Sequence, residues 1–114
     1  MREIEKKMVA AVVNQTELRG GNTTVEWDGP DGVVRLFGNP ICFLNRFDGT
    51  FKMSSSGWRT PTTRSRLNAL ASVLNDAVGA RIRDFDLEIS TDGGDTYESM
   101  TWSQTDAINT DAWA

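Results

Sequence analysis

The chain has 114 residues, of which 39% are hydrophobic and 25% are charged, and its formal net charge is −4. These values are typical of a soluble globular protein, so we expect a single domain over residues 1–114. Histidine is absent and Cys42 is the only cysteine, which excludes a histidine general base, an internal disulfide and the usual zinc sites. Carboxylates or lysine act alone in some enzymes, but the sequence offers no nucleophile–base pair. We therefore expect a protein that is not an enzyme and that holds no cofactor.

The basic and acidic residues are segregated along the chain. All 12 basic residues lie at or before Arg83. Residues 35–83 hold eight bases and two acids, whereas residues 84–114 hold eight acids and no base. This segregation predicts either a charged partner or contact between opposite poles of two copies.

The sequence carries no signal for a membrane. No apolar run approaches the roughly 20 residues that cross a bilayer. The first seven residues, MREIEKK, lack the uncharged stretch of a secretory signal. We therefore expect no membrane contact and a reducing, cytoplasmic location, which also suits a lone thiol.

The first half of the chain predicts one helix followed by strands. Ile4, Met8 and Val12 recur at i, i+4 and i+8, which predicts a short amphipathic helix over residues 2–14. Four segments separated by turns rich in glycine, proline and aspartate then predict strands over residues 23–27, 33–37, 41–47 and 50–54.

The Asp48-Gly49 pair predicts a two-residue hairpin loop that aligns Phe47 with Thr50. In that register Cys42 is expected to be a small buried apolar residue. The face of the hairpin that contains it also carries Leu44, Arg46, Phe51 and Met53.

A second helix has clear start and stop signals. Thr60 suits the N-cap position and Pro61 the first helical position. Apolar residues recur at helical spacing from Leu67 to Val78, and Gly79 is expected to end the helix.

Residues 82–90 predict a fifth strand with acids on one side and apolar residues on the other. A turn at residues 92–95 and a sixth strand over 97–102 follow, and from about 103 we expect a loose acidic segment. The element order predicts an α+β fold in which an antiparallel sheet of about five to six strands packs with two helices.

The first candidate site is acidic. Its carboxylates could cover a basic surface of another protein or imitate a nucleic-acid backbone, and its tryptophan could anchor the contact. The candidate partner-binding residues are Asp84, Asp86, Glu88, Asp92, Asp95, Glu98 and Trp102. The alternatives are a solvated edge strand, where charge opposes aggregation, and a cation site, although the spacing lacks a calcium-loop pattern and we expect no metal.

The second candidate site is the start of the second helix. Free N–H groups and arginines there could hold a phosphate, and a tryptophan could stack on a base. The residues concerned are Trp58, Arg59, Thr62, Thr63, Arg64 and Arg66. The alternative is a well-capped helix with solvated arginines, and the sequence pI of about 4.7 also argues against a nucleic-acid-binding module.

Residues 57–70, GWRTPTTRSRLNAL, resemble a motif in small proteins of tailed bacteriophages. Residues 21–26 and 36–39 are similar to the same group, so the resemblance covers roughly residues 20–75. It implies a setting rather than an activity: a small viral protein made inside a bacterium, in the host cytoplasm. Those proteins usually continue with a Gln-x-x-x-Trp strand, whereas residues 83–87 here are more acidic, so the resemblance implies no shared function for that part.

Three hypotheses follow. The first is a non-enzymatic phage accessory protein that binds and inhibits or modulates a host protein with a basic surface, in its most concrete form an anti-CRISPR-like inhibitor of a host defence enzyme that imitates nucleic acid. The alternative is a nucleic-acid-binding module that uses the basic helix start. The third is a homo-oligomer in which the basic middle of one copy meets the acidic end of the next.

Overall fold

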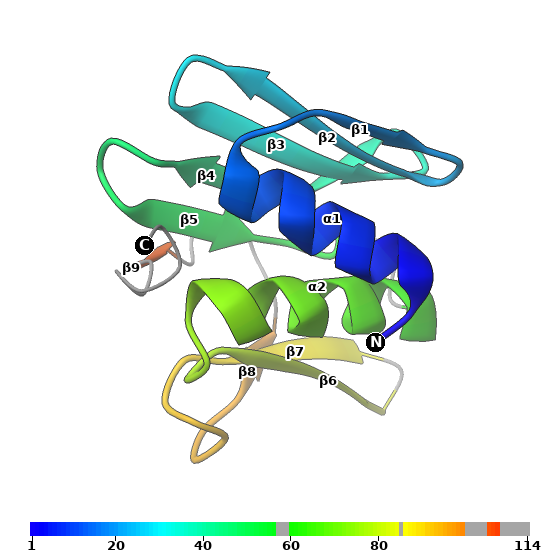
Figure 1. Ribbon diagram of the computed structural model, residues 1–114. Helices are drawn as coiled ribbons and strands as arrows, with labels where there is room; N and C mark the ends of the chain where they lie inside the picture. The colour runs from blue at the N-terminus through cyan, green and yellow to red at the C-terminus, as the bar shows by residue number, and fades with distance from the viewer. Residues whose placement is uncertain (57–59, 85, 100–104, 108–114) are drawn as a thin grey trace.

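The computed structural model describes residues 1–56, 60–84, 86–99 and 105–107. These residues form two helices and two antiparallel sheets, so the predicted α+β class is confirmed (Figure 1). The elements are α1 (Glu3–Asn14), β1 (Leu18–Gly20), β2 (Thr23–Asp28), β3 (Asp31–Leu36), β4 (Asn39–Asn45), β5 (Thr50–Met53), α2 (Pro61–Leu74), β6 (Gly79–Arg83), β7 (Asp86–Ser90), β8 (Glu98–Ser99) and β9 (Thr105–Ala107).

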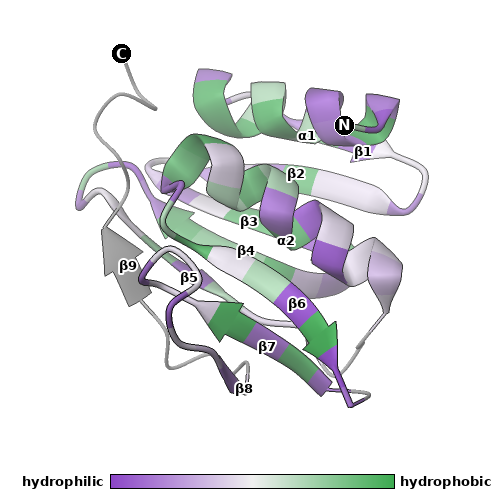
Figure 2. Cartoon of the chain, turned by 90° about the horizontal axis from the view of Figure 1, so that it is seen from below, coloured by the Kyte–Doolittle hydropathy of each residue, from purple (hydrophilic) through white to green (hydrophobic). Residues whose placement is uncertain are grey.

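The large sheet has the strand order β1-β2-β3-β4-β5-β9, and the small sheet has the order β6-β7-β8. Helix α2 lies between the two sheets, and α1 lies beside α2 on the same face of the large sheet (Figures 1 and 2). Strand alternation explains this arrangement, because Val25, Val34 and Leu44 point to one face of the large sheet and are buried there. Leu87 and Ile89 bury the small sheet in the same core. Within the described residues, no helix has the length and apolar character that a bilayer crossing needs.

The β4–β5 hairpin differs from its predicted register by two residues. Asn45, not Phe47, aligns with Thr50, so the loop has four residues. Arg46 leaves the ladder because its Nη1 donates to the carbonyls of Val12 and Val13 at 3.2 and 2.8 Å, where it caps the C-terminal end of α1. A shift of two residues keeps the paired side chains on their faces, so apart from Arg46 the predicted face is preserved, and Cys42, Leu44, Phe51 and Met53 are buried there.

Helix α2 begins as predicted at Pro61 but ends at Leu74, about one turn before the predicted stop. The cause is Asn75, whose side-chain oxygen accepts a hydrogen bond from the Ala77 N–H at 3.0 Å. This bond takes the place of the helical bond that the Ala77 N–H would otherwise make, so the helix ends. Val78 is buried in the loop that follows, and Gly79 begins β6 instead of ending the helix.

The predicted fifth strand is wrong, because residues 79–90 form a hairpin rather than one continuous strand. The chain turns at Asp84, whose φ of 50° lies in the left-handed region that aspartate tolerates better than most residues. The turn removes Asp84 from the row of strand acids. It also places Arg81 opposite Glu88 and Arg83 opposite Asp86, and such opposite-charge pairs stabilise a ladder.

The end of the chain is described only in part. The predicted sixth strand is observed as Glu98–Ser99, which pairs with β7. The expected loose segment does not hold for residues 105–107, because these form β9 and pair with β5. Trp58, Arg59, Trp102 and the rest of the acidic segment lie outside the described residues.

A side chain from α2 closes part of the exposed edge of β6. The Asn68 amide donates to the Ala80 carbonyl at 3.0 Å and accepts from the Ala80 N–H at 2.7 Å. We expect Asn68→Ala to lower the free energy of unfolding by about 1–3 kcal/mol, because two hydrogen bonds are lost. Urea denaturation measures the change. Ser72→Ala is the control, since Ser72 is exposed and its hydroxyl donates to the Ala69 carbonyl within α2, and equal effects of the two variants would contradict the prediction.

Candidate functional site

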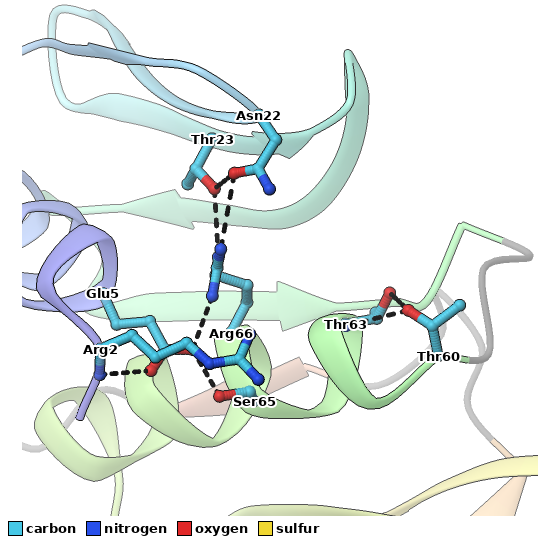
Figure 3. Close-up of polar contacts among 8 residues, drawn as sticks. All are labelled: Arg2, Glu5, Asn22, Thr23, Thr60, Thr63, Ser65 and Arg66. Carbon is cyan, nitrogen blue, oxygen red and sulfur yellow. Dashed lines mark hydrogen bonds and ion pairs between the residues drawn. The ribbon is translucent and has the colours of Figure 1, made fainter.

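The start of α2 is a well-capped helix end. The Thr60 hydroxyl accepts from the Thr63 N–H at 3.2 Å, which is the predicted N-cap (Figure 3). Thr63 is fully buried, and its own hydroxyl lies 3.1 Å from that of Thr60. Thr62 is half-buried and Arg64 is exposed. Thr63 therefore stabilises the helix start and does not present its hydroxyl to an anion in solution.

Arg66 is the centre of a buried polar cluster that joins α1, α2 and β2. Its side chain is 3% exposed, and Nη1 donates to Glu5 Oε2 at 2.8 Å (Figure 3). Nε donates to the Thr23 hydroxyl at 3.1 Å and Nη2 to Asn22 Oδ1 at 3.5 Å. The interpretation of Arg66 as an anion-binding residue is corrected, because its charge is already paired and hydrogen-bonded inside the protein.

Glu5, the partner of Arg66, was missed in the sequence. Its Oε2 also accepts from the Ser65 hydroxyl at 2.5 Å, and its Oε1 accepts from the Arg2 N–H at 3.1 Å. Burial alone would raise the pKa of Glu5, but the hydrogen bonds from Ser65, Arg2 and Arg66, together with the Arg66 charge, lower that pKa below its ordinary value. One signal was present: Glu5 lies three residues before Met8 and seven before Val12, on the apolar stripe of α1, where an acid requires a buried partner.

The strand acids of the first candidate site face arginines. Glu88 Oε1 accepts from Arg81 Nε at 2.9 Å, and the Arg81 guanidinium carbon lies 3.6 Å from the centre of the Tyr97 ring. Asp86 aligns with Arg83 and accepts from the Ser99 hydroxyl at 2.6 Å. The expected row of outward carboxylates of one sign is therefore corrected to a ladder of alternating charge.

The remaining acids of this site lie in loops and at the edge of the small sheet. Asp84, in the β6–β7 turn, has a side chain that is 95% exposed. Asp92 accepts hydrogen bonds from the hydroxyl and N–H of Thr96 and from the Ser90 hydroxyl, which lowers its pKa to about 2. Asp95 and Glu98 are exposed. Residues 79–99 hold six acids and two bases, so this end of the protein stays acidic despite the ladder.

Neither a metal site nor a reactive thiol is present in the described ranges. No three or more of their histidine, cysteine, aspartate and glutamate side chains converge as metal ligands. Burial raises the pKa of the Cys42 thiol to about 12, so this thiol is neutral and unreactive at physiological pH.

The phage setting suggested by the sequence can be compared with known families. The model of the family described as Kyanoviridae Gp96 protein matches residues 1–110. The chain belongs to this bacteriophage protein family. No curated protein and no solved structure matches it. The family match is wider than the resemblance over residues 20–75, and it includes both members of the Glu5–Arg66 pair and the acidic end of the protein.

The structure also presents exposed apolar side chains that the sequence reasoning did not single out. Phe37 and Phe47 lie at hairpin turns and are 65% and 88% exposed. Phe43, in the middle of β4, is 43% exposed on the face of the large sheet opposite the helices. The sequence does not show that Phe43 is exposed, because Phe43 lies between Cys42 and Leu44 in a continuous apolar run. Alternation of buried and exposed side chains becomes visible there only when the pairing of β4 with its neighbours is known.

Proposed function

We propose that this phage protein is a non-enzymatic accessory protein that binds a basic surface of a host protein through the acidic end of its small sheet. The observation that carries the proposal is the excess of exposed acid at this end. Asp84, Asp92, Asp95 and Glu98 are all exposed. The only bases of residues 79–99 are Arg81 and Arg83, which lie opposite the two strand acids, and Arg83 also lies 4.0 Å from Asp84 in a pair whose side chains are both largely exposed.

This distribution favours attraction over detailed imitation of a nucleic acid. A backbone mimic needs regularly spaced charges of one sign, whereas Glu88 is ion-paired with Arg81 and Asp86 faces Arg83. Acids in loops instead accelerate association with a basic surface and make binding sensitive to salt. Inhibition of a host defence enzyme remains one form that this binding could take.

The alternative of a nucleic-acid-binding module has less support. Thr63 and Arg66, two of its six residues, are buried inside the protein. Of the residues that remain described, Arg64 is the one exposed base. Burial of Arg66 removes one of the three arginines that this site would offer to a phosphate backbone, and non-specific affinity grows with the number of neutralised phosphates.

Charge reversal at the acidic end tests the proposal. We expect Asp95→Lys combined with Glu98→Lys to reduce the host protein captured from bacterial lysate about tenfold or more, which corresponds to about 1.4 kcal/mol. Capture by the wild-type protein should also fall between low and high salt. The readout is a pull-down with immobilised protein at two salt concentrations, with circular dichroism to confirm that the variant is folded.

Asp48→Lys is the matched control, because Asp48 is an exposed acid in the β4–β5 loop of the large sheet. It should leave capture unchanged. The proposal fails if the double variant captures the same protein as well as the wild type does, or if Asp48→Lys has the same effect as the double variant.

A further inference from the structure

The outer face of the large sheet, opposite the helices, carries an ordered row of four side chains. Strand pairing aligns Glu26 with Val33, Val33 with Phe43, and Phe43 with Lys52. The row therefore crosses β2, β3, β4 and β5 in the order acid, apolar, apolar, base. Glu26 and Lys52 are exposed, and Phe43 is 43% exposed.

The surface around Phe43 is hollowed on both sides. One hollow of about 260 Å³ lies toward β5 and is lined in part by Lys52, Thr50 and Asn45. A second hollow of about 260 Å³ lies toward β2 and is lined in part by Glu26 and Val33. Phe43 lines both, so this partly exposed residue lies between two recesses on the same face.

This row is complementary to itself. We propose that the outer face of the large sheet binds a second copy of this chain, with a two-fold axis parallel to the strands between β3 and β4. Rotation about that axis places Lys52 of the second copy opposite Glu26 and Phe43 of the second copy opposite Val33. Each contact occurs twice, as a two-fold interface requires, and the two sheets pack face to face with aligned strands.

The charges next to the row favour the same occupant. Asp28 and Asp31 are exposed cross-strand neighbours at the end of β2 and β3. Like charges directly opposite one another are destabilising, and the part of the chain that the structure describes places no basic group within ion-pair distance of either carboxylate. Lys52 of the second copy would approach this acidic side of the face and reduce the repulsion.

Glu26 is already paired with Arg35, whose Nε lies 3.1 Å from Glu26 Oε1. Both side chains are exposed, so this pair is weak and a second cation can join it. Lys52 has no ion pair within the described residues. The dimer therefore adds one ion pair at each end of the row without breaking an existing one.

Sedimentation velocity of the full-length chain tests the inference. We expect a dimer at roughly 100 µM protein in low salt that dissociates as salt is raised. Lys52→Glu should raise the dissociation constant about tenfold or more, because it opposes like charges twice. Phe43→Ser should weaken the dimer by a similar factor, because it removes the central apolar contact.

Charge exchange separates this arrangement from other dimers. The double variant Lys52→Glu with Glu26→Lys should regain dimerisation relative to Lys52→Glu alone, and Phe47→Ser, which changes an exposed ring outside the row, should leave the dimer intact. A wild-type protein that stays monomeric in low salt would overturn the proposal. A dimer that Lys52→Glu does not weaken, or that the charge exchange does not restore, would overturn it too.

Discussion

Replacing Arg66 with methionine is expected to lower the free energy of unfolding by about 3–5 kcal/mol, because the change leaves the Glu5 carboxylate buried without its cation. The side chains of Arg66 and Glu5 are each 3% exposed, and their charged atoms lie 2.8 Å apart. The pair joins α1 to α2, and the second Arg66 bond to Thr23 joins both helices to β2. Urea denaturation followed by circular dichroism measures the loss.

Arg64→Met is the matched control, since Arg64 lies two residues earlier on the exposed face of α2. Its effect should stay within about 0.5 kcal/mol. The double variant Glu5→Leu with Arg66→Met should recover a large part of the loss, because replacing a buried ion pair by apolar side chains is often close to neutral. If Arg66→Met destabilises no more than Arg64→Met does, the buried pair does not support the fold.

The pH dependence checks the same pair. The pKa of Glu5 is lowered in the folded protein, so the stability that its ionised form contributes is present above the unfolded pKa of about 4.3. That contribution is lost as the pH falls through the lower folded pKa. Removing Arg66 leaves burial to raise the pKa of Glu5 in the variant, so the variant loses part of its penalty as the pH falls and Glu5 takes up a proton. The difference in unfolding free energy between the wild type and Arg66→Met should therefore be largest near pH 7 and should shrink as the pH falls, with the wild-type contribution itself lost below about pH 4.

Truncating Leu87 to alanine is expected to lower the free energy of unfolding by about 2–5 kcal/mol, because it leaves a cavity in the core. Leu87 is 1% exposed on the face of β7 that joins the core against α2. The neighbouring change Glu88→Ala should cost less than about 1 kcal/mol, because the Glu88–Arg81 pair is partly exposed on the opposite face. Chemical denaturation of both variants gives the comparison, and similar losses would mean that the small sheet does not pack on the helix as described.

Much of the local structure was predictable. Thr23, Val25 and Trp27 alternate with polar residues in the sequence, and the structure buries Thr23 and Val25 on one face of β2, because side-chain alternation is a property of any strand. Thr60 and Pro61 correctly marked the start of α2, because a cap depends on groups within three residues. The hairpin register was less predictable, because Arg46 is drawn to a helix end more than 30 residues away in the chain.

The candidate sites were predictable in composition but not in arrangement. The excess of acid after Arg83 is read directly from the sequence. Which of these acids pair with arginines across β6 and β7, and which lie exposed in loops, depends on the turn at Asp84. The sequence does not indicate this turn, because acidic and apolar residues alternate there as in a single strand. The row from Glu26 to Lys52 was also hidden, because it combines four strands and exists only once their registers are set.

The sequence by itself determined the class of fold, the buried faces of the strands and the start of α2, because these depend on groups a few residues apart. Only the tertiary structure decided which charged residues form buried ion pairs that stabilise the fold and which are exposed to solvent. Arg66 and Glu5 are separated by 61 residues, and local spacing cannot identify a partner at that distance. A buried charge is tolerated only where folding brings its counter-charge to it, so the role of such a residue is set by the contacts of the complete fold.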